Sequence, residues 1–133
     1  MQEFTSKKLF ESLISDQIAE NQFLEFKAYH FPLGKIESKV KEELAKDIVA
    51  MANAEGGQII LGISESDKGV ATEVIGTGCP LSKFDDVQMA IKGVLMAKVR
   101  PRLHGISMQP IELSKDNIAI VLKYPRALLA RML

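Results

Sequence analysis

The sequence has little cysteine, no excess of charge and no long apolar run, and each shortage excludes a class of protein. A single cysteine, Cys79, excludes an internal disulfide framework and a cysteine-rich zinc site. No apolar stretch approaches the roughly eighteen residues of a membrane span. The acidic N-terminus, Met-Gln-Glu-Phe, is not followed by an apolar run and does not resemble a signal peptide. We therefore expect a cytoplasmic protein that has no membrane partner.

The charges cancel over the whole chain but are distributed unevenly. The 17 basic residues balance the 17 acidic ones, which argues against a protein that coats nucleic acid by bulk charge. Residues 1–86 carry 9 basic and 15 acidic side chains, whereas residues 87–133 carry 8 and 2. Two interpretations remain open at this point: the chain presents a basic patch to a polyanion, or the charges mix on the folded surface.

Apolar periodicity predicts a single α+β domain over residues 1–133. The predicted helices cover residues 5–14, 35–54 and 82–98, and the predicted strands cover 23–29, 58–63, 70–75, 103–113 and 117–124. This order predicts a mixed sheet of about five strands, packed with two main helices and a short N-terminal helix. The apolar residues 126–133 begin a further element, which is typical of the N-terminal part of a longer protein.

Two carboxylates stand at the first helix-to-strand junction. Glu20 and Glu25 lie on opposite faces if both belong to one strand, unless a turn brings them together. Paired carboxylates bind hard divalent cations, which can activate water against a phosphodiester. Lys27 shares the face of Glu25 and can pair with it or contact a phosphate. The pattern alone favours the simpler interpretation, a surface salt bridge.

Two further motifs bear on phosphate binding. The sequence Ala-Asn-Ala-Glu-Gly-Gly at residues 52–57 predicts a tight turn from a helix into the apolar strand 58–63. Its glycines follow a helix, the reverse of a phosphate-binding loop, and no P-loop motif occurs elsewhere. Arg100, Arg102 and His104 would line one face of an extended stretch, which suits phosphate contacts. A solvated helix end is an equally good interpretation of the same residues.

Together, the Glu20-to-Lys27 motif and residues 52–63 resemble the AlbA-like DNA-binding domain of the Schlafen family, over roughly residues 8–127. The resemblance implies nucleic-acid binding, often within bacterial transcriptional regulators in which further domains follow. Some relatives are metal-dependent endoribonucleases that cleave structured RNA, and they use the two carboxylates of this motif and an Asp after the next strand. Glu20 and Glu25 match the first two positions. The third position holds Ser64, with Glu65 and Asp67 close by.

We therefore predict a nucleic-acid-binding domain of a bacterial transcriptional regulator, with DNA preferred over RNA and no bound cofactor. The predicted phosphate contacts are Lys27, Lys35, Lys39, Lys41, Arg100 and Arg102. One alternative is an endoribonuclease dependent on Mg²⁺ or Mn²⁺, with Glu20 and Glu25 as catalytic residues and Glu20, Glu25, Glu65 and Asp67 as metal ligands. Another is a protein-interaction domain, for example a homodimer formed through the helix at 35–54 and the apolar C-terminus.

Overall fold

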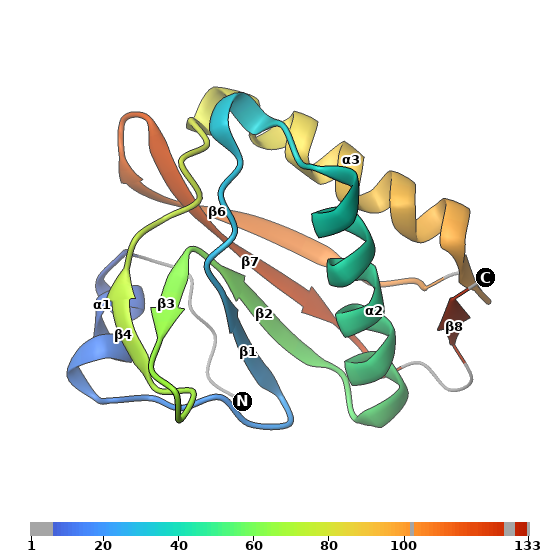
Figure 1. Cartoon of the computed structure of the whole chain (residues 1–133), viewed down its shortest axis with the longest axis horizontal. Coiled ribbons are helices and arrows are strands. Elements are labelled where there is room, and N and C mark those ends of the chain that lie inside the picture. Colours follow the sequence, from blue (N-terminus) through green and yellow to red (C-terminus); the bar gives the residue numbers. More distant parts are fainter. Residues whose placement is uncertain (1–6, 102, 127–129, 133) are drawn as a thin grey trace.

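The structure, a computed structural model, describes residues 7–101, 103–126 and 130–132 and is built on a four-stranded mixed sheet (Figure 1). The strand order is β1-β2-β7-β6, and the strands are β1 (Leu24–Lys27), β2 (Gly57–Leu61), β6 (Ser107–Ser114) and β7 (Asn117–Tyr124). β1 runs parallel to β2, whereas β2, β7 and β6 are antiparallel. The predicted α+β class with a mixed sheet is confirmed.

The central sheet has four strands rather than about five because the chain bends sharply after β2. Gly62 has a φ of +110°, a conformation that L side chains rarely adopt, and its carbonyl accepts hydrogen bonds from the N–H groups of Ile75 and Gly76 (2.9 and 2.8 Å). The chain then leaves the sheet and forms a separate hairpin. Its two strands are β3 (Ile63–Glu65) and β4 (Ala71–Val74).

Helices cover both faces of the sheet, which explains the continuous apolar run in β2. Ile59, Ile60 and Leu61 are all fully buried, as predicted for a strand at the centre of a sheet. The helices are α1 (Lys7–Ser15), α2 (Ser38–Ala54) and α3 (Phe84–Lys98). Helices α2 and α3 pack side by side on one face, and α1 and the β3–β4 hairpin pack on the other (Figure 1). No helix in the described part of the chain is long and apolar enough to cross a membrane.

The helix boundaries differ slightly from those predicted. Helix α2 begins three residues late because a 3-10 turn, η1 (Pro32–Gly34), and an extended segment precede it. It ends at Ala54 as predicted, and Gly56, just beyond it, has a φ of +78°, the left-handed conformation common after a helix. Helix α3 begins at Phe84, after the 3-10 turn η2 (Leu81–Lys83), and ends at Lys98 as predicted.

Two short strands tie the end of the chain to the helical layer. β5 (Val99–Arg100) pairs with β8 (Arg131–Met132), so the segment expected to begin a further element contains a strand. Just before β8, the Asn53 side chain in α2 donates to the carbonyl of Ala130 (2.6 Å) and accepts from its N–H (2.8 Å). This two-point clamp joins segments that are far apart in the sequence.

We expect Asn53→Ala to lower the free energy of unfolding by about 1–2 kcal/mol, because both backbone groups of Ala130 lose their partner. Urea unfolding measures the change. Asn53→Asp is the matched variant: it keeps an acceptor for the Ala130 N–H but sets a carboxylate oxygen, which cannot donate, against the Ala130 carbonyl, so it should also be less stable than the wild type. Equal stability of all three proteins would contradict the clamp.

Candidate nucleic-acid interface

A turn before β1 folds the Glu20 side chain back onto the strand. The Phe23 N–H donates to Asn21 Oδ1 (2.7 Å), and the backbones of Asn21 and Leu24 exchange hydrogen bonds (3.0 and 3.2 Å). As a result, the Phe26 N–H donates to Glu20 Oε2 (2.8 Å). The two predicted carboxylates therefore do not lie on opposite faces of one strand. The turn, which the sequence left open, brings Glu20 toward β1.

The β3–β4 hairpin brings a second carboxyl group to Glu20. The Glu20 N–H donates to the Gly69 carbonyl at the hairpin turn (2.8 Å). Partial burial raises the pKa of the Glu65 carboxyl group. The hydrogen bond to Glu20 and the negative charge of Glu20 raise this pKa further, to about 7. Ser64 instead lies with its hydroxyl 3.2 Å from that of Thr72 across the hairpin. Asp67 is exposed in the turn.

The shared proton of this carboxyl pair predicts a pH-dependent stability. Glu65 has a folded pKa of about 7 against an ordinary value of 4.5, so the folded state binds more protons between these pH values. The free energy of unfolding should therefore fall as pH rises from 4.5 to 7, by about 1 kcal/mol once exposure is taken into account. Urea unfolding across this range measures it. Glu65→Gln should remove the fall, and Glu73→Gln on β4 is the matched control that should keep it.

Lys27 lies between carboxylates from two elements. Its Nζ is 3.2 Å from Glu25 Oε1, as their shared face predicted, and 3.4 Å from Asp47 Oδ2 in α2. It also lies 5.9 Å from the ring centroid of Tyr29. Partial burial works against the charged form, but the two carboxylates outweigh it and hold the pKa of Lys27 above its usual value. A phosphate would have to compete with both carboxylates, so a nucleic-acid contact by Lys27 stays a prediction.

The carboxylates near β1 are engaged with neighbouring side chains. Within residues 7–101, 103–126 and 130–132, no three His, Cys, Asp or Glu side chains are arranged so that they could hold a metal ion. Glu25 is paired with Lys27, and partial burial raises the pKa of its carboxyl group. Glu65 and Glu20 are joined by a hydrogen bond. A metal site formed by Glu20, Glu25, Glu65 and Asp67 therefore stays a prediction.

Three predicted phosphate contacts gather where α2 begins. Lys35 and Lys39 are exposed and Lys41 is half-buried, and none of the three forms an ion pair with a described residue. Glu37, at the N-cap, makes no capping side-chain hydrogen bond, so the N–H groups of the first turn are not capped by it. Cationic side chains beside a helix N-terminus are a favourable setting for a phosphate.

A groove between α2 and α3 continues this basic surface. It has a volume of about 320 Å³ and is lined by Ser38, Lys41, Glu42, Val94 and Lys98. Lys98 Nζ lies 3.4 Å from Glu42 Oε1 across the groove. The predicted contacts omitted Lys98, although it begins the basic segment 98–104. Only the packing of α2 against α3 shows that it shares a groove with Lys41.

Arg100 forms hydrogen bonds to the backbone that the sequence pattern did not predict. Its Nη1 donates to the carbonyls of Met96 and Val99 (2.7 and 2.8 Å). The guanidinium group thereby supplies a hydrogen-bond donor to carbonyl groups at the end of α3. Across the β5–β8 pair it lies opposite Arg131, and both line a cavity of about 540 Å³ with Pro101 and Ala130. Arg131 was not among the predicted contacts, because no local pattern in the sequence predicts that β5 pairs with β8. Arg102 lies outside the described residues.

The sequence matches the family described as Schlafen, AlbA_2 over residues 20–130, and the chain belongs to this family. Among solved structures, it is similar to the N-terminal domain of a RecG-related protein from Nitrosomonas europaea, which is named for its relation to an ATP-dependent DNA helicase. That likeness has a TM-score of 0.57 at 20% identity and covers 94% of this chain and 75% of the other. It shows a shared fold. No curated protein matches the chain.

Proposed function

We propose that this domain binds nucleic acid, with duplex DNA as its preferred partner, as part of a cytoplasmic bacterial transcriptional regulator. The observation that carries the proposal is the group of three lysines, Lys35, Lys39 and Lys41, at the start of α2, with no ion pair to a described residue. The groove between α2 and α3 adds Lys98 beside Lys41. Membership of the Schlafen AlbA_2 family supports this choice.

The proposed contacts are to phosphates rather than to bases. Lysine ammonium groups and uncapped N–H groups at a helix end bind the phosphate oxygens of a nucleic acid. Such contacts carry no information about the base sequence. Neither α2 nor α3 is rich in Arg, Asn and Gln, the side chains that read base edges in the major groove. Affinity should therefore depend strongly on salt and only weakly on sequence.

A binding assay across a salt series tests the proposal. Fluorescently labelled single- and double-stranded DNA and RNA are titrated with the protein, with and without Mg²⁺ or Mn²⁺. We expect duplex DNA to bind most tightly, with an affinity that falls as salt rises and no need for metal. An absence of binding to every polymer at low salt would overturn the proposal and favour a protein-interaction domain, for which light scattering reports a homodimer.

The same assay separates binding from cleavage. Metal-dependent cleavage of structured RNA that disappears in Glu25→Gln would put the nuclease alternative first. Glu112→Gln, in the exposed part of β6, is the matched control. Loss of cleavage in both variants would point to a general effect on the protein rather than to a carboxylate that acts on the substrate.

A further inference from the structure

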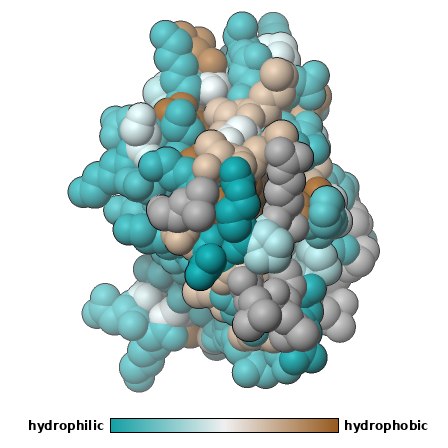
Figure 2. All heavy atoms as spheres, turned by 90° about the vertical axis from the view of Figure 1, so that its right-hand side faces the viewer, coloured by the Kyte–Doolittle hydropathy of each residue, from teal (hydrophilic) through white to brown (hydrophobic). Residues whose placement is uncertain are grey.

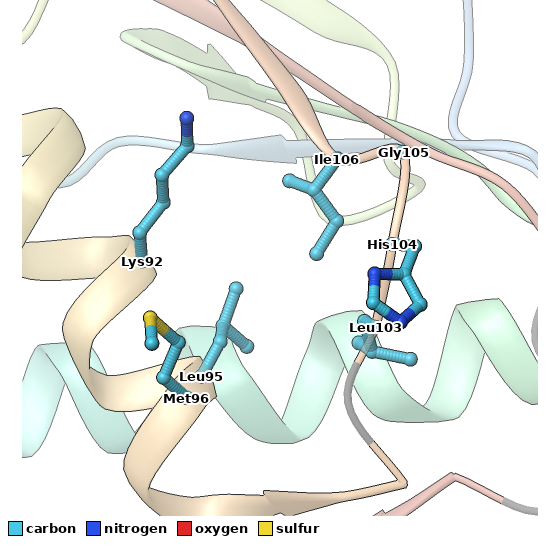
Figure 3. A pocket seen from close by; sticks show the side chains of 7 residues that line it. All are labelled: Lys92, Leu95, Met96, Leu103, His104, Gly105 and Ile106. Atoms are coloured by element: carbon cyan, nitrogen blue, oxygen red, sulfur yellow. The ribbon is translucent and has the colours of Figure 1, made fainter.

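A cavity between α3 and the segment before β6 lies outside the proposed interface. It has a volume of about 310 Å³, and Figure 3 shows side chains from α3 and from residues 103–106 around one open space. The lining residues are Lys92, Leu95, Met96, Leu103, His104, Gly105 and Ile106. The volume is at the small end of the range for ligand pockets, about 300–1,000 Å³, which indicates a small ligand.

The walls of the cavity are mostly apolar. Leu95 is 6% exposed and belongs to the main core, and Leu103 and Ile106 pack against that core. Met96 is 55% exposed, although it is a large apolar side chain. A methionine wall adapts to ligands of different shape because its side chain is flexible and polarizable. At the end of the molecule where α3 finishes, Figure 2 shows apolar side chains bordered by hydrophilic ones.

Two nitrogen-bearing side chains stand on opposite sides of this apolar space. Lys92 comes from α3 and His104 from the opposite wall (Figure 3). Lys92 is exposed and forms no ion pair with a described residue. None of the described lining residues is acidic. The cavity therefore offers an apolar surface with an ammonium group and an imidazole at its edge, which suits an anion that carries an apolar body.

We propose that this cavity binds a small monocarboxylate with an aliphatic body, the class to which medium-chain fatty acids belong. The aliphatic body would lie against Leu95, Met96 and Ile106, and the carboxylate would lie at the edge of the cavity, near Lys92. A doubly charged anion is less well matched, because the mostly apolar walls would leave part of its charge unpaired.

Titration with octanoate, followed by the amide chemical shifts of the intact chain, tests this proposal. We expect shifts concentrated in the second half of α3 and in residues 103–106. Octylammonium has the same body and the opposite charge and should bind at least tenfold more weakly. Lys92→Gln should weaken octanoate binding by roughly two- to fivefold, the range expected for an exposed charge pair. Lys68→Gln, in the turn between β3 and β4, is the control and should bind octanoate as the wild type does.

A second variant tests the apolar part of the site. Met96→Trp places a larger side chain at the exposed wall and should reduce octanoate binding at least tenfold while the fold, read from the remaining amide shifts, is kept. The proposal is overturned if octylammonium binds as tightly as octanoate, if neither variant weakens octanoate binding, or if octanoate causes no saturable shift in the lining residues.

Discussion

Exchange of Lys35, Lys39 and Lys41 together for glutamine should lower the affinity for duplex DNA by roughly tenfold or more. Each lysine that contacts a phosphate releases a counterion, so losing all three should also reduce the slope of log affinity against log salt by about three. Electrophoretic mobility shift or fluorescence anisotropy at several salt concentrations measures both quantities. Because the three side chains form no ion pair with a described residue, stability should hardly change.

A second triple variant separates local contacts from net charge. Lys8, Lys68 and Lys115 are exposed, lie away from the start of α2, and likewise form no ion pair with a described residue. Their exchange for glutamine changes the net charge by the same amount. An equal loss of affinity in the two triple variants would show that overall charge, rather than the start of α2, binds the DNA.

Gly57→Ala should lower the free energy of unfolding by about 3 kcal/mol or more, the largest effect on stability that we expect from one methyl group. Gly57 has a φ of +152°, and a Cβ there would lie 2.6 Å from the Phe23 carbonyl oxygen. That oxygen accepts a hydrogen bond from the Gln58 N–H (2.8 Å), so the strand cannot move away without losing a contact between β1 and β2. In a chain of this size, a loss of this kind lowers the melting temperature by roughly 10 °C.

Gly93→Ala is the control, and it should act in the opposite direction. Gly93 lies on the exposed side of α3, and a Cβ there would meet no atom within 4 Å. Alanine is the better helix former, so the exchange should stabilise the protein by about 0.5–1 kcal/mol. Calorimetry on both variants measures the pair. A similar melting temperature for Gly57→Ala and Gly93→Ala would contradict the close approach of Phe23 to β2.

Local patterns in the sequence were sufficient to predict much of the fold. Alternation placed Glu25 and Lys27 on one face of β1, and the apolar run placed β2 in the centre of the sheet. Both conclusions depend only on residues close together in the chain, where the two-residue period of a strand sets the direction of each side chain. The Schlafen resemblance, which rested on the same local motifs, is also confirmed.

Contacts between distant segments could not be predicted from local patterns in the sequence. The partner of Lys27 in α2, Asp47, depends on how that helix packs against β1. The hydrogen bonds from Arg100 Nη1 to carbonyls at the end of α3 depend on the turn of the chain into β5, and a phosphate contact by Arg100 stays a prediction. The clamp between Asn53 and Ala130 joins two segments whose local sequences give no sign of each other.

The central position of β2 also affects the synthesis of the chain. Its parallel partner β1 is made earlier, but Ile60 pairs on the other side with Val121 of β7, which leaves the ribosome much later. Until then, the apolar residues 59–61 have an open edge and an incomplete cover, and an unpaired apolar strand readily associates with other chains. Fragments that end before residue 117 should therefore aggregate, and nascent chains of that length are those that most need a chaperone.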